Sequence, residues 1–252
     1  MRKGNRDVLT TGQLSVGHVF RLLPKVMGQE SISLWLMFSG VGSALNLLSV
    51  LLQYGVGIGG PVASLIALLF TLVISVVACF VHYAAIHAAD MRLADRPLQA
   101  VQTLWIASHR FWDYLAMALL MGFVVTVGTL LLVIPGLFVW IAFSLALPAL
   151  ALRQFGISES MRVSWLATEG RRWRLLAIWL VCVVAGFVAL IGVGLLFAAL
   201  FHLLGVGPVA VQFLMVCVMD PVFTGASLVV TGAVSTTVFR LMELEAPEIL
   251  EA

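Results

Sequence analysis

The fourteen Lys and Arg residues are confined to four parts of the chain, and long apolar stretches separate them. They lie in the N-terminal segment, in residues 88–113, in residues 153–174 and at Arg240. Charged residues make up 10% of the 252 positions and hydrophobic residues 62%. A soluble domain carries roughly 25% charged and 45–50% apolar residues. The composition therefore excludes a soluble enzyme, a DNA-binding domain and a disordered chain, and it predicts an all-α, polytopic integral membrane helix bundle.

Six apolar stretches are candidates for membrane spans, each close to the roughly 20 helical residues that a bilayer core requires. The fourth is short and contains Pro148, so we expect a kink there, with the freed carbonyl covered by neighbouring helices. The spans are expected at about 32–54, 62–87, 114–134, 137–153, 175–203 and 221–241. Residues 209–219, before Asp220-Pro221, are interpreted as an interfacial or re-entrant helix.

The two ends of the chain flank this membrane domain of residues 32–241. Residues 1–31 are basic and contain the pattern of a short amphipathic surface helix, which Pro24 is able to interrupt. The first apolar run begins near Ile32 and is too long for a cleaved signal peptide, so we expect an uncleaved span. Residues 242–252 form an acidic tail. The apolar face of the surface helix is expected to hold Val16, Val19, Phe20, Leu23 and Met27.

The positive charges also predict how the chain is oriented. Three short connections lack any charge and combine Gly with Pro: Gly55–Pro61, Pro135-Gly136 and Gly205–Pro208. All Lys and Arg residues fall on the other side of the predicted spans. Because cytoplasmic loops retain positive charge, both termini and both long loops are expected in the cytoplasm.

The two long loops resemble each other, which indicates an internal repeat. Four positions of the first loop match four of the second at a fixed offset, and they advance by three and four along one helical stripe. Trp112 and Trp173 then match with one extra residue, for which Gly170 is the expected site. We therefore expect two cytoplasmic amphipathic interfacial helices in a parallel repeat, with Trp at headgroup level. The matched positions are Leu98, Val101, Trp105 and Ser108 with Ser158, Met161, Trp165 and Thr168.

The block from Ile134 to Leu176 also resembles a known family. Pro135-Gly136 opens a span, Pro148-Ala149 lies near its end, and Ser158–Trp165 and Gly170–Trp173 follow. This block is similar to bacterial six-span membrane proteins grouped with the membrane domain of glycerophosphoryl diester phosphodiesterase. The opening Leu14–Leu23 is similar to the usual start of that family. The resemblance implies a multi-pass protein of the bacterial inner membrane.

Some relatives carry a separate phosphodiesterase domain after the membrane domain. Here the chain ends at Ala252, so we expect no enzyme activity. The sequence also has Arg153-Gln154 where the family often has an acidic residue, which argues against transferring a role to that carboxylate.

Residues able to carry chemistry are few and scattered. The acids form no paired-carboxylate site, and His82 and His87 lie about 140° apart around a helix, which disfavours a shared metal. The three cysteines lie singly in apolar runs, as small buried side chains do. We expect no catalytic, cofactor-binding or metal-binding residues.

Two groups of residues remain as site candidates. Asp220 is either the N-cap of the sixth span, with its oxygen near the Phe223 or Thr224 amide, or a carboxylate for proton or cation transport. Asn46 and Gln53 are interpreted as interhelical hydrogen-bond partners. The second group either contacts an anionic lipid headgroup or simply retains the loop in the cytoplasm. It consists of Arg171, Arg172, Trp173 and Arg174.

These observations favour a non-enzymatic membrane protein, either an embedded scaffold or a lipid-interacting module. A transporter of small solutes or lipids is the alternative, and a component of a membrane enzyme is the third. Membrane lipids are the expected partners, nucleic acid is not, and homo-oligomers are compatible with the sequence.

Overall fold

The structure is a computed structural model that describes residues 15–55, 60–96 and 100–245. All regular structure in these ranges is helical. Six helices within these ranges are long and apolar enough to cross a membrane, which agrees with the predicted all-helical, multi-pass membrane protein. The second and sixth candidates extend beyond the expected spans. The six are Gln29–Gln53, Gly60–Leu93, Phe111–Leu131, Ile134–Arg153, Arg172–Leu203 and Val209–Glu245.

The helices follow one another through short connections. Two π-helical segments, η1 and η2, interrupt the α-helical geometry. The elements are α2 (Val16–Val26), α3 (Gln29–Val50), η1 (Leu51–Gly55), α4 (Gly60–Leu93), α5 (Ala100–Ser108), α6 (Phe111–Leu131), α7 (Val133–Phe143), α8 (Ala146–Arg153), α9 (Ile157–Thr168), α10 (Arg172–Leu203), α11 (Pro208–Leu214), η2 (Met215–Met219) and α12 (Asp220–Glu245).

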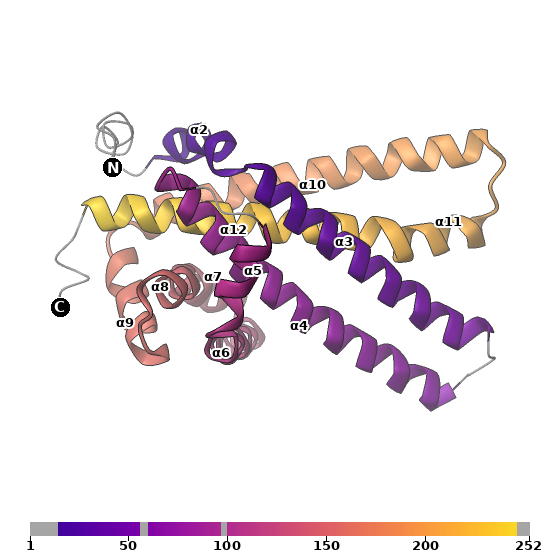
Figure 1. Cartoon of the computed structure of the whole chain (residues 1–252), viewed down its shortest axis with the longest axis horizontal. Helices are drawn as coiled ribbons and strands as arrows, with labels where there is room; N and C mark the ends of the chain where they lie inside the picture. Colours follow the sequence, from indigo (N-terminus) through magenta and orange to yellow (C-terminus); the bar gives the residue numbers. More distant parts are fainter. Residues whose placement is uncertain (1–14, 56–59, 97–99, 246–252) are drawn as a thin grey trace.

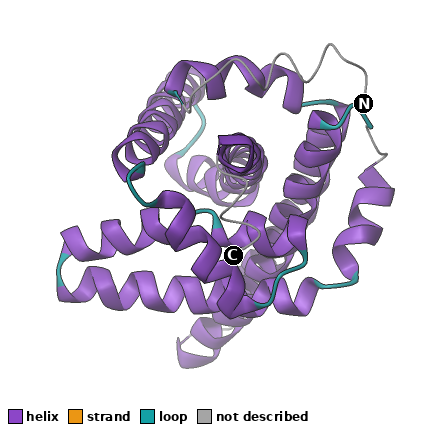
Figure 2. Cartoon of the chain, turned by 90° about the vertical axis from the view of Figure 1, so that its left-hand side faces the viewer, coloured by secondary structure: helices purple, strands orange, loops and turns teal. Residues whose placement is uncertain are grey.

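Four long helices, α3, α4, α10 and α12, run along the long axis of the molecule (Figure 1). We call the end near both termini the charged end, because Asp90, Arg92, Arg240 and Glu243 lie there. The opposite end, which holds the α10–α11 connection, is the turn end. Seen along the long axis, α12 lies in the centre (Figure 2). It packs against α2, α3, α4 and α8, so it organises the bundle.

The α6–α7 hairpin is oriented differently. It is seen end-on in Figure 1 and side-on in Figure 2, so it runs crosswise to the four long helices. The two helices pack closely, since a Cβ on Gly128 would lie 3.1 Å from the Cα of Gly136. The turn falls at Leu132, and Pro135 lies inside the first turn of α7. The expected turn at Pro135-Gly136 is therefore misplaced, because proline is tolerated at the start of a helix.

Buried side chains concentrate at the charged end. In α4 they run from Val81 to Asp90, and in α12 they are densest from Gly232 to Met242. The turn-end halves of α4 and α10 expose rows of Leu, Val and Phe instead. Apolar side chains in such numbers need an apolar surrounding, which a bilayer provides.

The kink predicted in the fourth span is present. Helix α7 ends at Phe143 and α8 begins at Ala146, shortly before Pro148, whose missing N–H and ring disrupt the preceding turn. The Ser164 hydroxyl accepts from the Leu145 N–H at 3.2 Å and donates to the Ala142 carbonyl at 2.8 Å. Thr168 also donates to that carbonyl, at 3.3 Å. Helix α9 thus covers the broken turn at Ala142, whereas coverage of the Ser144 carbonyl, which Pro148 leaves without its helical donor, stays a prediction.

Residues 209–219 do not form a separate interfacial or re-entrant helix. Elements α11, η2 and α12 follow without a break as one helix, and the π-helical turn comes just before Pro221. The wider π turn lets the chain pass the proline, which has no N–H to donate. The Asp220-Pro221 pair predicted a helix start. The change from α-helical to π-helical hydrogen bonding at Met215–Met219 instead lets the helix continue through this pair.

Candidate functional site

A groove between α10 and α12 is the main candidate site. Helix α10 packs against α2 and α7, but farther along a groove of ≈ 790 Å³ separates it from η2 and α12. One wall carries small residues of α10, including Ala185, Gly186 and Gly194. Pockets for small molecules are mostly apolar and measure about 300–1,000 Å³. The groove therefore has the size and lining to hold an apolar or amphipathic molecule.

Among the described residues that line this groove, Asp220 is the one that carries a charge. It has helical backbone angles (φ −59°, ψ −50°), and its N–H bonds to the carbonyl of Met215. An N-cap residue has non-helical angles, so the capping interpretation of Asp220 is wrong. The residue lies inside a continuous helix because the π turn replaces the helix start that Asp220-Pro221 suggested.

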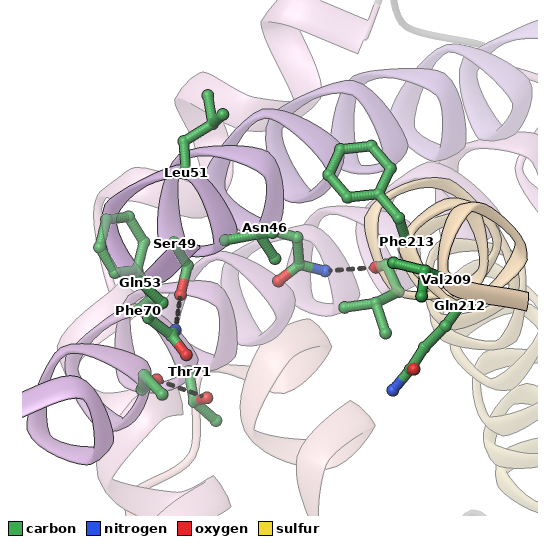
Figure 3. Close-up of a pocket in the computed structure, with 12 residues that line it drawn as sticks. Asn46, Ser49, Leu51, Gln53, Phe70, Thr71, Val209, Gln212 and Phe213 are labelled. Carbon is green, nitrogen blue, oxygen red and sulfur yellow. Dashed lines mark hydrogen bonds between the residues drawn. The ribbon is translucent and has the colours of Figure 1, made fainter. Parts of the chain in front are cut away.

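A second groove, of ≈ 710 Å³, lies between α3, α4 and α11 towards the turn end (Figure 3). Asn46 donates from its side-chain amide to the Val216 carbonyl at 2.9 Å, which confirms it as an interhelical hydrogen-bond partner. Gln53 instead donates to the Ser49 hydroxyl of its own helix at 2.9 Å, so its interhelical interpretation is wrong. The four-residue spacing places these two side chains on one helix face.

The basic cluster at the start of α10 divides into inward and outward residues. Arg171 forms an ion pair with Glu245 at 3.3 Å. The guanidinium of Arg172 lies 4.3 Å from the ring centre of Phe138 and 4.4 Å from that of Trp165. Such cation–π contacts hold α10 against α7 and α9. Trp173, 83% exposed, and Arg174, which is also exposed, lie on the outer surface of the helix.

Both loop stripes are helical in the described residues, as α5 and α9. Leu98 lies outside the described residues. The central tryptophans differ, since Trp105 is 67% exposed whereas Trp165 is 39% exposed and packs on Phe143. Gly170 has φ +72°, a conformation that favours glycine, in the turn before α10. The break expected at Gly170 is present, and the repeat itself stays a prediction.

The two histidines of α4, His82 and His87, face different neighbours. His82 accepts or donates one hydrogen bond with the Tyr114 hydroxyl at 2.7 Å, while His87 packs edge-on against Tyr83. No group of three or more His, Cys, Asp or Glu residues suited to a metal occurs in the described ranges.

The sequence analysis did not predict a network of ion pairs at the charged end. Arg240 of α12 pairs with Asp90 of α4 at 2.5 Å and with Glu243 at 2.6 Å. Glu243 also pairs with Arg153 of α8. Charged residues at the ends of otherwise apolar helices were the available signal, because such residues need partners. This network of ion pairs joins α4, α8 and α12 and stabilises their packing at the charged end.

No protein-family model, curated protein or solved structure matches this chain. The resemblance to the phosphodiesterase membrane-domain family therefore stays a prediction, and the functional argument depends on the geometry above.

Proposed function

We propose that this protein is a non-enzymatic, lipid-interacting membrane protein that holds amphipathic molecules from the bilayer in the groove between α10 and α12. The groove itself is the observation that carries this proposal. Its walls belong to two helices that are apolar enough to cross a membrane, so lipid chains are the molecules that reach it first. Small residues on α10 leave room for a chain along the helix.

The charged end is proposed to face the cytoplasm of a bacterial cell. The positive-inside distribution of Lys and Arg supports this orientation. In this proposal the four long helices cross the bilayer. The α6–α7 hairpin adds two crossings if it spans the membrane and none if it does not. Both termini are therefore on the same side whatever the α6–α7 hairpin does. Trp173 and Arg174 then lie at the level of the inner headgroups, where they suit an anionic lipid.

Lipid retained in the groove is testable by photo-crosslinking. The protein is reconstituted with a phosphatidylcholine that carries a diazirine in its acyl chain, extracted in detergent, freed of loose lipid and irradiated. Cross-links are expected on α10 and α12 at groove-lining positions. Gly194→Phe should abolish them by filling the groove, whereas the matched Gly192→Phe should not, since Gly192 does not line it. A Cβ at either glycine meets no atom within 4 Å.

A transporter is the second candidate, and one observation favours it. An acidic side chain inside a membrane-spanning helix is by default a functional hypothesis. Asp220 has this position, but it lines a different groove from that of Asn46 and Gln53. Uptake of a substrate by vesicles that contain the protein, lost in Asp220→Asn, would favour transport over simple binding.

A further inference from the structure

The carboxylate of Asp220 is the one Asp, Glu, Lys or Arg charge in the apolar parts of the two helices that wall the groove. Residues 175–201 and 209–239 contain no other Asp, Glu, Lys or Arg. The next basic residue along its helix is Arg240, twenty positions away, or about 30 Å at 1.5 Å per residue. Four acids of the charged end, in contrast, pair with arginine. These pairs are Glu30–Arg92, Asp90–Arg240, Glu243–Arg153 and Glu245–Arg171.

The Asp220 side chain is exposed into the groove and forms no ion pair or hydrogen bond with the described residues. A carboxylate in apolar surroundings is costly unless an opposite charge accompanies it. Among the described residues, no group that lines the groove supplies that charge, because the other lining residues are apolar, small or hydroxyl-bearing. The groove therefore holds a negative charge for which its described lining offers no positive partner.

The rest of the lining suits the body of such a ligand. Phe197 and Phe223 offer aromatic rings, whose faces attract cations, and Met215 and Met219 offer adaptable thioethers. The Thr224 and Ser227 side chains add hydroxyl oxygens. Together they form an apolar surface around one negative charge.

The position of Asp220 along the groove limits the shape of the ligand. The lining on this helix extends from Met215 to Thr231. Asp220 lies about 8 Å from the first and about 16 Å from the second along the axis. Apolar lining thus continues on both sides of the carboxylate. A lipid carries its charge at one end, at headgroup level, whereas this arrangement fits a charge inside an apolar body.

We infer that the groove binds a compact amphipathic cation whose positive centre pairs with the Asp220 carboxylate. The inference rests on the proposed function, because it assigns a ligand class to the same groove. The occupant is a free hydrophobic cation rather than an amine-headed lipid. Lipid chains occupy the groove when no such cation is present.

Binding of radiolabelled tetraphenylphosphonium to the full-length protein in phosphatidylcholine nanodiscs tests this inference. We expect saturable binding that Asp220→Asn weakens at least about tenfold, because the charge pair is lost while the side chain keeps its shape. Asp220→Glu should retain most of the binding. Asp113→Asn is the matched acid control, since Asp113 pairs with Arg110 outside the groove, and it should leave binding unchanged. Tetraphenylborate, of the same shape and opposite charge, should not compete.

Equal affinity of wild type and Asp220→Asn, or competition by tetraphenylborate, would overturn the inference. Asp220-dependent cross-linking of a diazirine-bearing phosphatidylethanolamine, without phosphonium binding, would overturn it in favour of an amine-headed lipid. The thermal midpoint of each variant checks folding, and Gly194→Phe provides a second variant that should block phosphonium by filling the groove.

The lipid cross-linking experiment separates this inference from the proposed function. If the wild-type protein retains lipid in the groove but the affinity for phosphonium does not depend on Asp220, only the cation inference fails. If phosphonium binding depends on Asp220 but no lipid cross-links map to the groove, the lipid proposal fails and the cation site stands. Where both are right, phosphonium displaces the cross-linkable lipid from wild-type protein.

Discussion

The side-chain amide of Asn46 donates a hydrogen bond to the carbonyl oxygen of Val216 at 2.9 Å, and this bond completes the π turn of the sixth span. In an α-helix that carbonyl would accept from the N–H of Asp220, but this N–H bonds to Met215 instead. In the π register its partner would be residue 221, which is proline and has no N–H. Asn46 thus satisfies a carbonyl that Pro221 leaves without a backbone donor.

Replacing Asn46 should therefore destabilise the bundle. Asn46→Ala is expected to lower the free energy of unfolding by about 1–2 kcal/mol, because the Val216 carbonyl is left unpaired. Titration with a denaturing detergent in mixed micelles measures this change. In a Pro221→Ala background the cost should shrink, since residue 221 then supplies an N–H. An equal cost in both backgrounds would contradict the explanation.

The kink between α7 and α8 should depend on Ser164 more than on Thr168. Ser164→Ala removes both hydrogen bonds across the break and leaves the Leu145 N–H unpaired, which should cost about 1–3 kcal/mol. Thr168→Val should cost less, since the Ala142 carbonyl keeps its bond from Ser164. The same unfolding titration compares the two variants, and the reverse order would show that Ser164 does not support the kink.

Two glycines of α12 are expected to be irreplaceable because neighbouring helices approach them closely. A Cβ on Gly225 would lie 2.9 Å from Phe38 Cδ1, and one on Gly232 would lie 2.9 Å from the Cβ of Ala85. Substitution of either by Ala should destabilise by about 1–3 kcal/mol through overpacking. Gly186→Ala, where no atom lies within 4 Å, should be neutral or stabilising in a thermal melt. Matching midpoints for all three variants would refute this packing.

Loss of Arg240 should be more costly than loss of Arg110. Arg240→Gln leaves Asp90 and Glu243, whose side chains are each only 11% exposed, without one of their positive partners. The expected cost is about 2–3 kcal/mol, reduced from that of a fully buried pair by partial exposure. Arg110→Gln breaks a pair with Asp113, which is 52% exposed, and should cost less than about 1 kcal/mol. Unfolding titrations of both variants measure the difference.

Topology is testable by cysteine labelling after Cys79, Cys182 and Cys217 are replaced. A membrane-impermeant maleimide added to intact cells should label Gly207→Cys, whereas Ser108→Cys should react only after permeabilisation. Leu132→Cys, at the tip of the crosswise apolar hairpin, should resist labelling from both sides because it stays in the lipid. Labelling of Leu132→Cys from outside would instead indicate that α6 and α7 cross the membrane.

The sequence alone determined the candidate spans, because crossing a bilayer is a local requirement on length and apolarity that each stretch meets or fails by itself. The kink near Pro148 was predictable for the same reason, since a missing N–H affects its own turn. The direction of the α6–α7 hairpin was not predictable, because packing against other helices sets it. The π turn that carries Asp220 through the helix also required the tertiary structure, since its orphan carbonyl is satisfied by Asn46, 170 residues earlier. In the same way, only the packing of α4 beside α12 brings Asp90 to Arg240, and only the separation of α10 from α12 leaves Asp220 facing a groove without a cation.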